Sequence, residues 1–138
     1  MAAALIVSCA DGRLRELLLA LETRLDVADA DRLLVPGGPL ALIEGQRGRQ
    51  AMVDWLELLV RGHDMDLVCL VSHEDCLAYA HRLAGSADDE RSVLEDDLAE
   101  ARRLIVGRYP GIPVECFVVP CAHGGGAGRL GAPERVAL

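Results

Sequence analysis

Short apolar runs that alternate with segments of helical periodicity constrain the fold more than any other feature of this sequence. Four runs have the length and composition of strands buried on both faces, and they lie at 5–9, 32–35, 66–71 and 113–119. Between them, hydrophobic residues recur at the spacing of amphipathic helices, as at Leu14, Leu17, Leu18, Leu21 and Leu25 and at Met52, Trp55, Leu56 and Leu59. This alternation predicts an α/β fold: a mostly parallel β-sheet of about four strands, flanked by helices and joined by right-handed crossovers.

A further helix is predicted between the third and fourth runs. Ser86 followed by Asp89 is typical of a capping box, and the apolar positions beyond it continue a helix to about Gly107. Seven acidic residues lie between Asp88 and Glu100. We interpret them as the solvated face of this helix rather than as a partner site.

The length of 138 residues predicts one domain. We place a single α/β domain at 1–120 and a glycine-rich C-terminal tail at 121–138. The apolar end of the tail, Val136-Ala137-Leu138, has two interpretations: it docks on a neighbouring subunit, or it is disordered.

The charge balance excludes several classes of function. Fourteen basic residues, all of them arginine, against 22 acidic residues give a net charge of −8, which argues against a nucleic-acid partner. The absence of lysine excludes Schiff-base chemistry and the lysine of an ATP-binding P-loop. We find no membrane span or signal peptide, and therefore expect a cytoplasmic protein with no membrane partner. In that compartment the five cysteines are expected to be free thiols or metal ligands.

Two of the predicted strands are followed by residues of the types that commonly bind metals in proteins. The first strand runs into Cys9-Ala10-Asp11-Gly12-Arg13, and the third runs into His73-Glu74-Asp75-Cys76. If these strands are neighbours in a parallel sheet, their ends bring Cys9 close to His73 and Cys76. Two thiolates and one imidazole suit zinc, and three protein ligands leave a fourth position open for water.

Asp11 and Arg13 follow Cys9 at alternate positions, so an extended backbone would direct both towards the same space and allow a charge-assisted pair. The complete pattern, Cys9-x-Asp11-x-Arg13 and later His73-x-x-Cys76 in a small α/β chain, resembles the β-class carbonic anhydrases. The resemblance implies that Cys9, His73 and Cys76 bind zinc. It also implies that Asp11 is an exchangeable fourth ligand and that Arg13 draws Asp11 off the metal in the active state.

The resemblance implies a function as well. A zinc lyase of this class would hydrate carbon dioxide reversibly to bicarbonate by means of zinc-bound hydroxide, and would form a homodimer or a higher homo-oligomer with its active site beside the dimer interface. A proton must then leave the site, and His63, His81 and His123 are the remaining side chains with a suitable ordinary pKa. Because the sequence places none of them near the metal, each is more simply an exposed histidine without a function.

Three departures from the family pattern favour an alternative. Ser72 and Leu77 stand where family members usually carry glycine, and Pro36-Gly37-Gly38-Pro39 replaces an Arg-Asn-Ala-Gly segment. The alternative is a catalytically degenerate homologue that binds zinc for structure, or that binds a small ligand or a partner. Asp11 held permanently on the metal would produce this outcome, because a closed site has no position for water.

A minor alternative uses the same first loop for different chemistry. Cys9 and Arg15 have the spacing of a cysteine-phosphatase loop and resemble that of the low-molecular-weight tyrosine phosphatases. Asp11 and Glu16 would, however, place negative charge in the phosphate cradle.

The other cysteines are weaker candidates. Cys69 and Cys116 lie within predicted strands, where core packing is the simpler interpretation. Cys121-Ala122-His123 offers a possible ligand from a glycine-rich segment.

Overall fold

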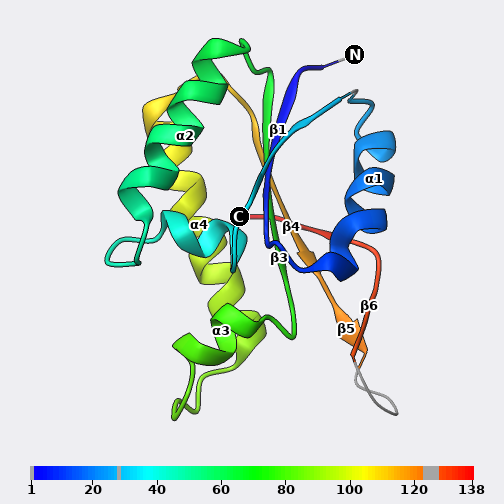
Figure 1. Cartoon of the computed structure of the whole chain (residues 1–138), viewed down its shortest axis with the longest axis vertical. Helices are drawn as coiled ribbons and strands as arrows, with labels where there is room; N and C mark the ends of the chain where they lie inside the picture. Colours follow the sequence, from blue (N-terminus) through cyan, green and yellow to red (C-terminus); the bar gives the residue numbers. More distant parts are fainter. Residues whose placement is uncertain (1, 28, 123–127) are drawn as a thin grey trace.

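The fold is a five-stranded sheet with helices on both faces (Figure 1). It was obtained as a computed structural model, which describes residues 2–27, 29–122 and 128–138. In the described part of the chain the strand order is β2-β1-β3-β4-β7. The bounds are Ala4–Ser8 (β1), Asp31–Leu34 (β2), Leu67–His73 (β3), Val114–Val119 (β4) and Glu134–Val136 (β7). The first four strands are parallel, and β7 is antiparallel to β4.

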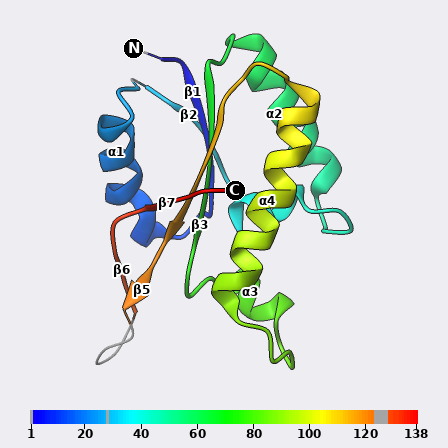
Figure 2. The same ribbon diagram turned by 180° about the vertical axis from the view of Figure 1, so that it is seen from behind.

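Helices α2 and α4 cover one face of the sheet, and α1 covers the other (Figures 1 and 2). The helices are α1 (Arg15–Arg24), α2 (Arg49–Gly62), α3 (Leu77–Arg82) and α4 (Glu90–Arg108). Two 3₁₀ helices and a small separate two-stranded sheet complete the described structure: η1 (Gly12–Leu14), η2 (Gly38–Leu42), β5 (Cys121–Ala122) and β6 (Arg129–Leu130). The predicted α/β class and the mostly parallel sheet are therefore confirmed.

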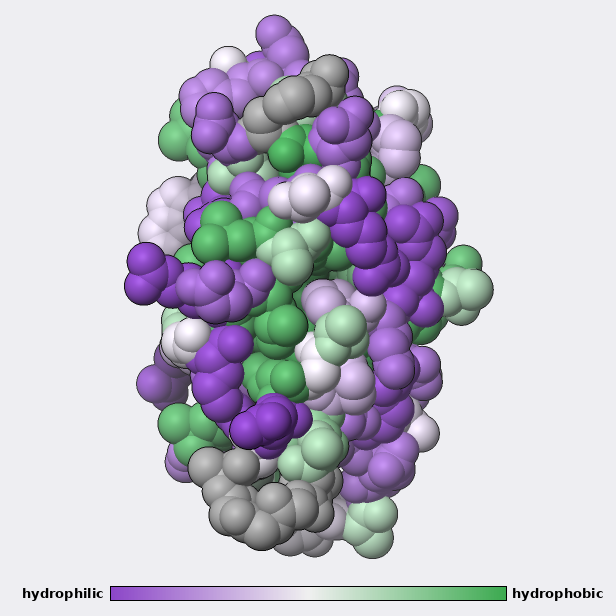
Figure 3. All heavy atoms as spheres, turned by 90° about the vertical axis from the view of Figure 1, so that its right-hand side faces the viewer, coloured by the Kyte–Doolittle hydropathy of each residue, from purple (hydrophilic) through white to green (hydrophobic). Residues whose placement is uncertain are grey.

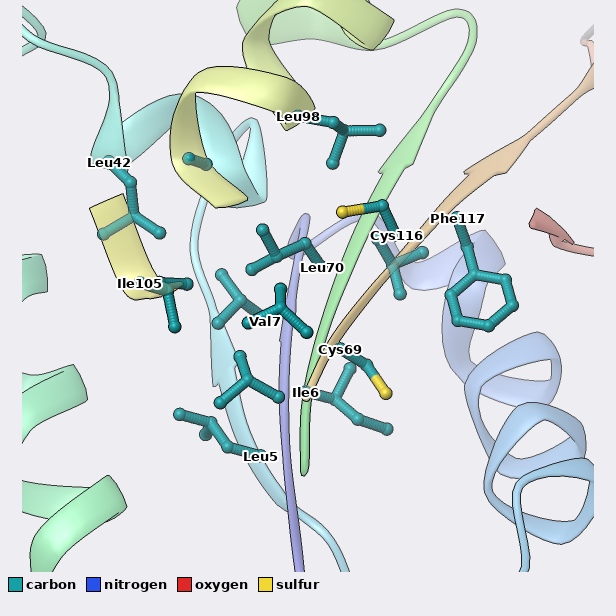
Figure 4. Close-up of a cluster of buried hydrophobic side chains, with 14 of the residues drawn as sticks. Leu5, Ile6, Val7, Leu42, Cys69, Leu70, Leu98, Ile105, Cys116 and Phe117 are labelled. Carbon is teal, nitrogen blue, oxygen red and sulfur yellow. The ribbon is translucent and has the colours of Figure 1, made fainter. Parts of the chain in front are cut away.

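The hydrophobic core has two layers because successive residues of a strand point to opposite faces of the sheet. Ile6, Cys69 and Phe117 point towards α1, whereas Val7 and Leu70 point towards α4 (Figure 4). All five are fully buried. Strands covered on both faces must be continuously apolar, which is the pattern that the sequence shows.

The start of α4 differs from the sequence prediction. Asp89, and not Ser86, is its N-cap, because the Asp89 carboxylate accepts a hydrogen bond of 3.0 Å from the backbone N–H of Ser92. The Ser86 hydroxyl instead accepts from the N–H of Asp88. A short aspartate side chain directly before the helix caps it as well as serine does, so the capping-box spacing gave the wrong first residue.

The end of the chain adds an edge to the sheet. Strand β7 places Val136 opposite Cys116 of β4 and Arg135 opposite Phe117. The guanidinium of Arg135 lies 5.4 Å from the centre of the Phe117 ring, and that of Arg24 lies 5.3 Å from it. Val136 thus pairs within its own chain, which differs from a disordered end. Docking of the apolar end on a neighbouring subunit and the domain boundary at 120 stay predictions.

The surface on the α1 side carries mainly hydrophilic side chains around a narrower hydrophobic band (Figure 3). Among the helices in the described ranges, none combines the length and the apolar character needed to cross a bilayer.

Candidate metal centre

Parallel pairing of β1 and β3 brings the two predicted motifs to the same edge of the sheet. Ser8, the last residue of β1, lies opposite Val71 of β3. Cys9 follows directly, His73 ends β3, and Cys76 is the residue before α3. The potential ligand atoms of Cys9, His73 and Cys76 all lie within 4.8 Å of one another, and all three residues are buried. The structure therefore brings these three side chains together, while their role as metal ligands stays a prediction.

The hydrogen bonds of the cluster leave His73 ready to bind a metal. Its Nδ1 lies 2.7 Å from the carbonyl oxygen of Glu74, which accepts a hydrogen bond from Nδ1–H. Its Nε2 is buried and has no hydrogen-bond partner in the described residues. A buried polar atom without a partner is costly, and outer-shell bonding through the other ring nitrogen is usual for metal-binding histidines. The donor set of two sulfurs and this nitrogen fits zinc.

The two thiols of the cluster differ in acidity: Cys9 ionises more readily than an ordinary thiol, and Cys76 less readily. A hydrogen bond from Cys76 is the largest cause that lowers the pKa of Cys9, contacts with His73 and with the backbone N–H of Gly37 lower it as well, and burial opposes them. The same contact, together with burial, raises the pKa of Cys76. Burial opposes protonation of His73, yet its contacts with Cys9 and Glu74 raise its pKa. A cation bound here would displace the remaining protons and neutralise the thiolates.

Asp11 lies at the edge of this cluster but is turned towards Arg13. Its Oδ2 is 4.0 Å from the unpartnered Nε2 of His73. The same oxygen accepts a bond of 2.8 Å from Arg13 Nη2, and Arg13 Nε reaches both carboxylate oxygens at 3.2 Å. This pairing lowers the pKa of Asp11 to about 2 and raises that of Arg13. The predicted ion pair is present, and Asp11 sits between the arginine and the ligand cluster.

Arg13 has further partners that the sequence analysis did not identify. Its Nη1 donates to Asp75 Oδ2 at 3.1 Å and to the carbonyl of Gly128 at 2.8 Å, and its Nη2 donates to the carbonyl of Asp75 at 3.1 Å. Asp75 belongs to the second motif, so its position beside Cys76 was visible in the sequence. Its contact with a residue 62 positions earlier was not.

A pocket of about 340 Å³ opens beside Cys9 and Asp11. Its walls are mostly small and apolar, formed by Ala10, Pro36, Gly37, Leu77 and Ala78, and His81 also lines it. Leu77 is 75% exposed. A pocket of this kind suits a small neutral molecule that approaches the ligand cluster.

The three histidines considered for proton transfer have different outcomes. His81 lines the pocket. His63 is paired with Asp31 at the start of β2, which is the opposite end of the parallel sheet from Cys9. His123 lies outside the described residues. Placement near the site therefore favours His81 over His63.

The other cysteines do not join the cluster. Cys69 and Cys116 are buried within β3 and β4, as expected for core residues. Among the described residues, the group of close ligands contains Cys9, His73 and Cys76 only, and Cys121 is not part of it.

The first loop does not have the open backbone of a phosphate cradle. The N–H of Ala10 donates to Val35, the N–H of Leu14 donates to the Asp11 carbonyl, and the N–H of Arg13 donates to the Asp11 side chain. Arg15 begins α1 and is exposed. Because these N–H groups already have partners, the geometry does not favour the phosphatase interpretation.

Comparison with known proteins identifies the fold. The chain matches no protein-family model and no curated protein sequence. It is similar to the crystal structure of CafA, a β-carbonic anhydrase of the fungal pathogen Aspergillus fumigatus, with 17% identity, 86% of this chain and 71% of that chain covered, and a TM-score of 0.50. It is also similar to β-carbonic anhydrase isoform I of the protozoan Trichomonas vaginalis, with 14% identity, coverage of 94% and 82%, and a TM-score of 0.50.

These matches show that the chain has the fold of the β-carbonic anhydrases. The resemblance expected from the two motifs is thus confirmed at the level of the fold.

Proposed function

We propose that this chain is a zinc-dependent carbonic anhydrase-like protein that hydrates carbon dioxide reversibly to bicarbonate. One observation carries the proposal: the buried Nε2 of His73 has no partner among the described residues, and His73 offers a ligand atom within 4.8 Å of two cysteine sulfurs beside a pocket. The shared fold with two β-carbonic anhydrases supports the same interpretation.

Each residue of the site has a distinct part in this proposal. Cys9, His73 and Cys76 would hold the ion, and the carbonyl of Glu74 orients the imidazole so that Nε2 is its free face. A zinc ion held in this way supplies a Lewis acid that lowers the pKa of water to about 7. Arg13 keeps the Asp11 carboxylate away from the ligand cluster.

The pocket contributes by its shape and polarity. Its apolar walls, formed in part by Gly37, Leu77 and Ala78, limit the water that reaches the site and leave room for carbon dioxide, which is small and has no net charge. His81 is the proposed route by which the proton leaves, since it is the protonatable imidazole that lines this pocket in the described part of the chain.

A zinc-binding protein without turnover is the second candidate function. Asp11 Oδ2 is only 4.0 Å from His73 Nε2, so a small rotation of the carboxylate away from Arg13 would bring it to the fourth ligand position. Four protein ligands make a closed, structural site. The two candidates therefore differ in whether Asp11 stays with Arg13.

Two measurements on the purified full chain test the proposal. Metal analysis is expected to give about one zinc per chain, the stoichiometry of a single three-ligand site. Stopped-flow hydration of carbon dioxide is then expected to exceed the uncatalysed rate at neutral to alkaline pH.

The variants Asp11→Ala and Arg13→Ala separate the candidates. Catalysis is supported if the Arg13 variant, in which Asp11 is free to reach the metal, is slower than the natural chain. Zinc binding with no rate above background in any of the three proteins would support the structural role, and absence of zinc would contradict both.

The assembly and location belong to the same proposal. We propose a homodimer or higher homo-oligomer in the cytoplasm. Exposed apolar side chains on one face of α2 support association, because Trp55 is 50% exposed and Leu58, three residues later, is 68% exposed. Light scattering should give at least twice the chain mass of 14.8 kDa, and a monomer at micromolar concentration would contradict this part.

A further inference from the structure

The guanidinium of Arg13 is held from two sides at once. Its Nε and Nη2 face Asp11, while Nη1 donates to Asp75 Oδ2 and to the Gly128 carbonyl. Nη2 also donates to the carbonyl of Asp75 at 3.1 Å. These bonds are simultaneous, so Asp75 does not take Arg13 away from Asp11. It instead holds the guanidinium through Nη1 and Nη2 while Asp11 remains bonded.

Asp75 is itself fixed by its backbone. Its φ of 59° lies in the left-handed region, which residues other than glycine rarely adopt. The backbone N–H of Asp75 donates to Glu90 Oε1 of α4 at 2.8 Å. The preceding residue, Glu74, accepts at 2.8 Å from the N–H of Cys121. The surrounding elements thus hold a turn that directs both the carboxylate and the carbonyl of Asp75 at Arg13.

This arrangement matters because two positions are within reach of the Asp11 carboxylate, one at Arg13 and one at the ligand cluster. It is bonded to Arg13 now, and it lies 4.0 Å from the unpartnered nitrogen of His73. An unrestrained arginine side chain has many rotamers and would release the carboxylate for part of the time. Restraint of the guanidinium therefore sets how often Asp11 can approach a bound cation.

We propose that Asp75 is a positioning residue that clamps Arg13 against Asp11 and so keeps Asp11 out of the metal's ligand sphere. The consequence for zinc rests on the proposed function, whereas the restraint of Arg13 does not. The role is positional rather than stabilising, because the two side chains are 35% and 47% exposed and exposed ion pairs contribute little to stability.

The substitution Asp75→Asn tests the clamp with little disturbance of the backbone. Asparagine adopts the left-handed conformation as aspartate does, but it is neutral and makes a weaker bond to a guanidinium. Asp64→Asn is the matched control. Asp64 is exposed, has a φ of 48°, and precedes β3 at the end of the sheet opposite to His73.

The first readout is the rate at which zinc leaves the loaded protein for a chelator. In Asp75→Asn, Asp11 is expected to act more often as a fourth ligand, so zinc should leave about tenfold more slowly, at the lower end of outer-shell effects on metal sites. The difference between Asp75→Asn and the natural chain should disappear when each also carries Asp11→Ala, because the clamp acts only through Asp11. A rate equal to that of Asp64→Asn, or a slowing that persists without Asp11, would overturn the proposal.

The second readout needs no metal. The Nε–H group of Arg13 gives its own signal in a ¹H–¹⁵N NMR spectrum, and its heteronuclear NOE reports the rigidity of the side chain. We expect this NOE to be lower in metal-free Asp75→Asn than in the natural chain and in Asp64→Asn. If the protein binds no zinc, the proposed function fails, and the NOE alone then tests whether Asp75 restrains Arg13. An NOE in Asp75→Asn equal to that of the natural chain would contradict this restraint.

Discussion

Cys76 is the residue whose removal tests the metal centre most directly. The variant Cys76→Ala loses one of the three buried ligand atoms. We expect its zinc affinity to fall by more than about 100-fold, because changes to outer-shell residues alone cost 10–100-fold. Competition with a chromophoric chelator measures the affinity.

Cys69→Ala is the control for that variant. Cys69 is also buried and lies in β3, seven residues before Cys76, but it points towards α1 in the core (Figure 4). Its removal is expected to leave zinc binding unchanged. Full zinc occupancy in Cys76→Ala would contradict the assignment of this ligand.

Cys69 also predicts how stability depends on alkaline pH. Burial raises its pKa to about 12 from an ordinary value of 9.0. A raised pKa means that the thiol ionises first in the unfolded chain, so its contribution to stability is complete below pH 9 and is lost as the pH rises towards 12. The free energy of unfolding of the natural chain should therefore fall with pH in this window by up to about 1.4 kcal/mol per pH unit for this group.

Chemical denaturation at several pH values checks this dependence. Cys69→Ala lowers stability below pH 9 through lost packing, but its slope above pH 9 should be smaller than that of the natural chain. Equal slopes would show that Cys69 does not carry the effect.

At the level of residues, the sequence was sufficient to propose the side chains that are chemically reactive and stand at the end of an apolar run. Cys9, His73 and Cys76 could be proposed as a group because each follows or ends an apolar run. Asp75 could not, since its partner Arg13 is 62 residues away and the contact depends on a left-handed turn held by another helix. A sequence shows the chemistry of single residues, but it does not show which of them are restrained by residues far along the chain.

Helix α3 is the element on which the site depends most, because it begins after Cys76 and carries the Leu77 and Ala78 walls of the pocket. It has only six residues and is marginal without tertiary contacts. The buried Asp97 of α4 anchors it by accepting hydrogen bonds from Tyr79 and Arg82.

Removal of this anchor should loosen both the helix and the site. Asp97→Ala leaves the buried Tyr79 hydroxyl and the partly buried Arg82 without their acceptor, at an expected cost of about 2 kcal/mol. Denaturant unfolding measures this loss, and zinc release should become faster. The exposed neighbour Asp96→Ala serves as the control and should do neither. A stable Asp97 variant would show that α3 is held by apolar packing alone.

At the level of elements, long apolar runs were predictive and short polar elements were not. Strand β3 was expected at 66–71 and extends to His73, because its pairing with β4 continues through Val119. Strand β7 was missed because its three residues, Glu134–Val136, include a single hydrophobic side chain. An antiparallel edge strand needs backbone hydrogen bonds on one side only, and its sequence is correspondingly free.

For the whole molecule, the order of the strands was the decisive unknown. The class of fold followed from alternating helices and strands, but several strand orders satisfy that pattern. All parallel orders put the carboxyl ends of β1 and β3 at the same edge, but only an order with β1 beside β3 makes these two ends direct neighbours, as they are here. Strand order is set by how all the helices pack together, so no local stretch of sequence determines it.

A metal held between these elements should stabilise the entire fold. The three candidate ligands follow β1, end β3 and precede α3, so an ion that binds them links segments more than 60 residues apart in a chain that unfolds as one domain. At a free zinc concentration 100 times Kd, the added stability is about 2.7 kcal/mol, which raises Tm by roughly 10 °C. Differential scanning calorimetry at rising zinc concentrations measures the shift. The Cys76→Ala protein should show little of it, whereas Cys69→Ala should show all of it, and a Tm independent of zinc in the natural chain would mean that these three residues do not bind the ion.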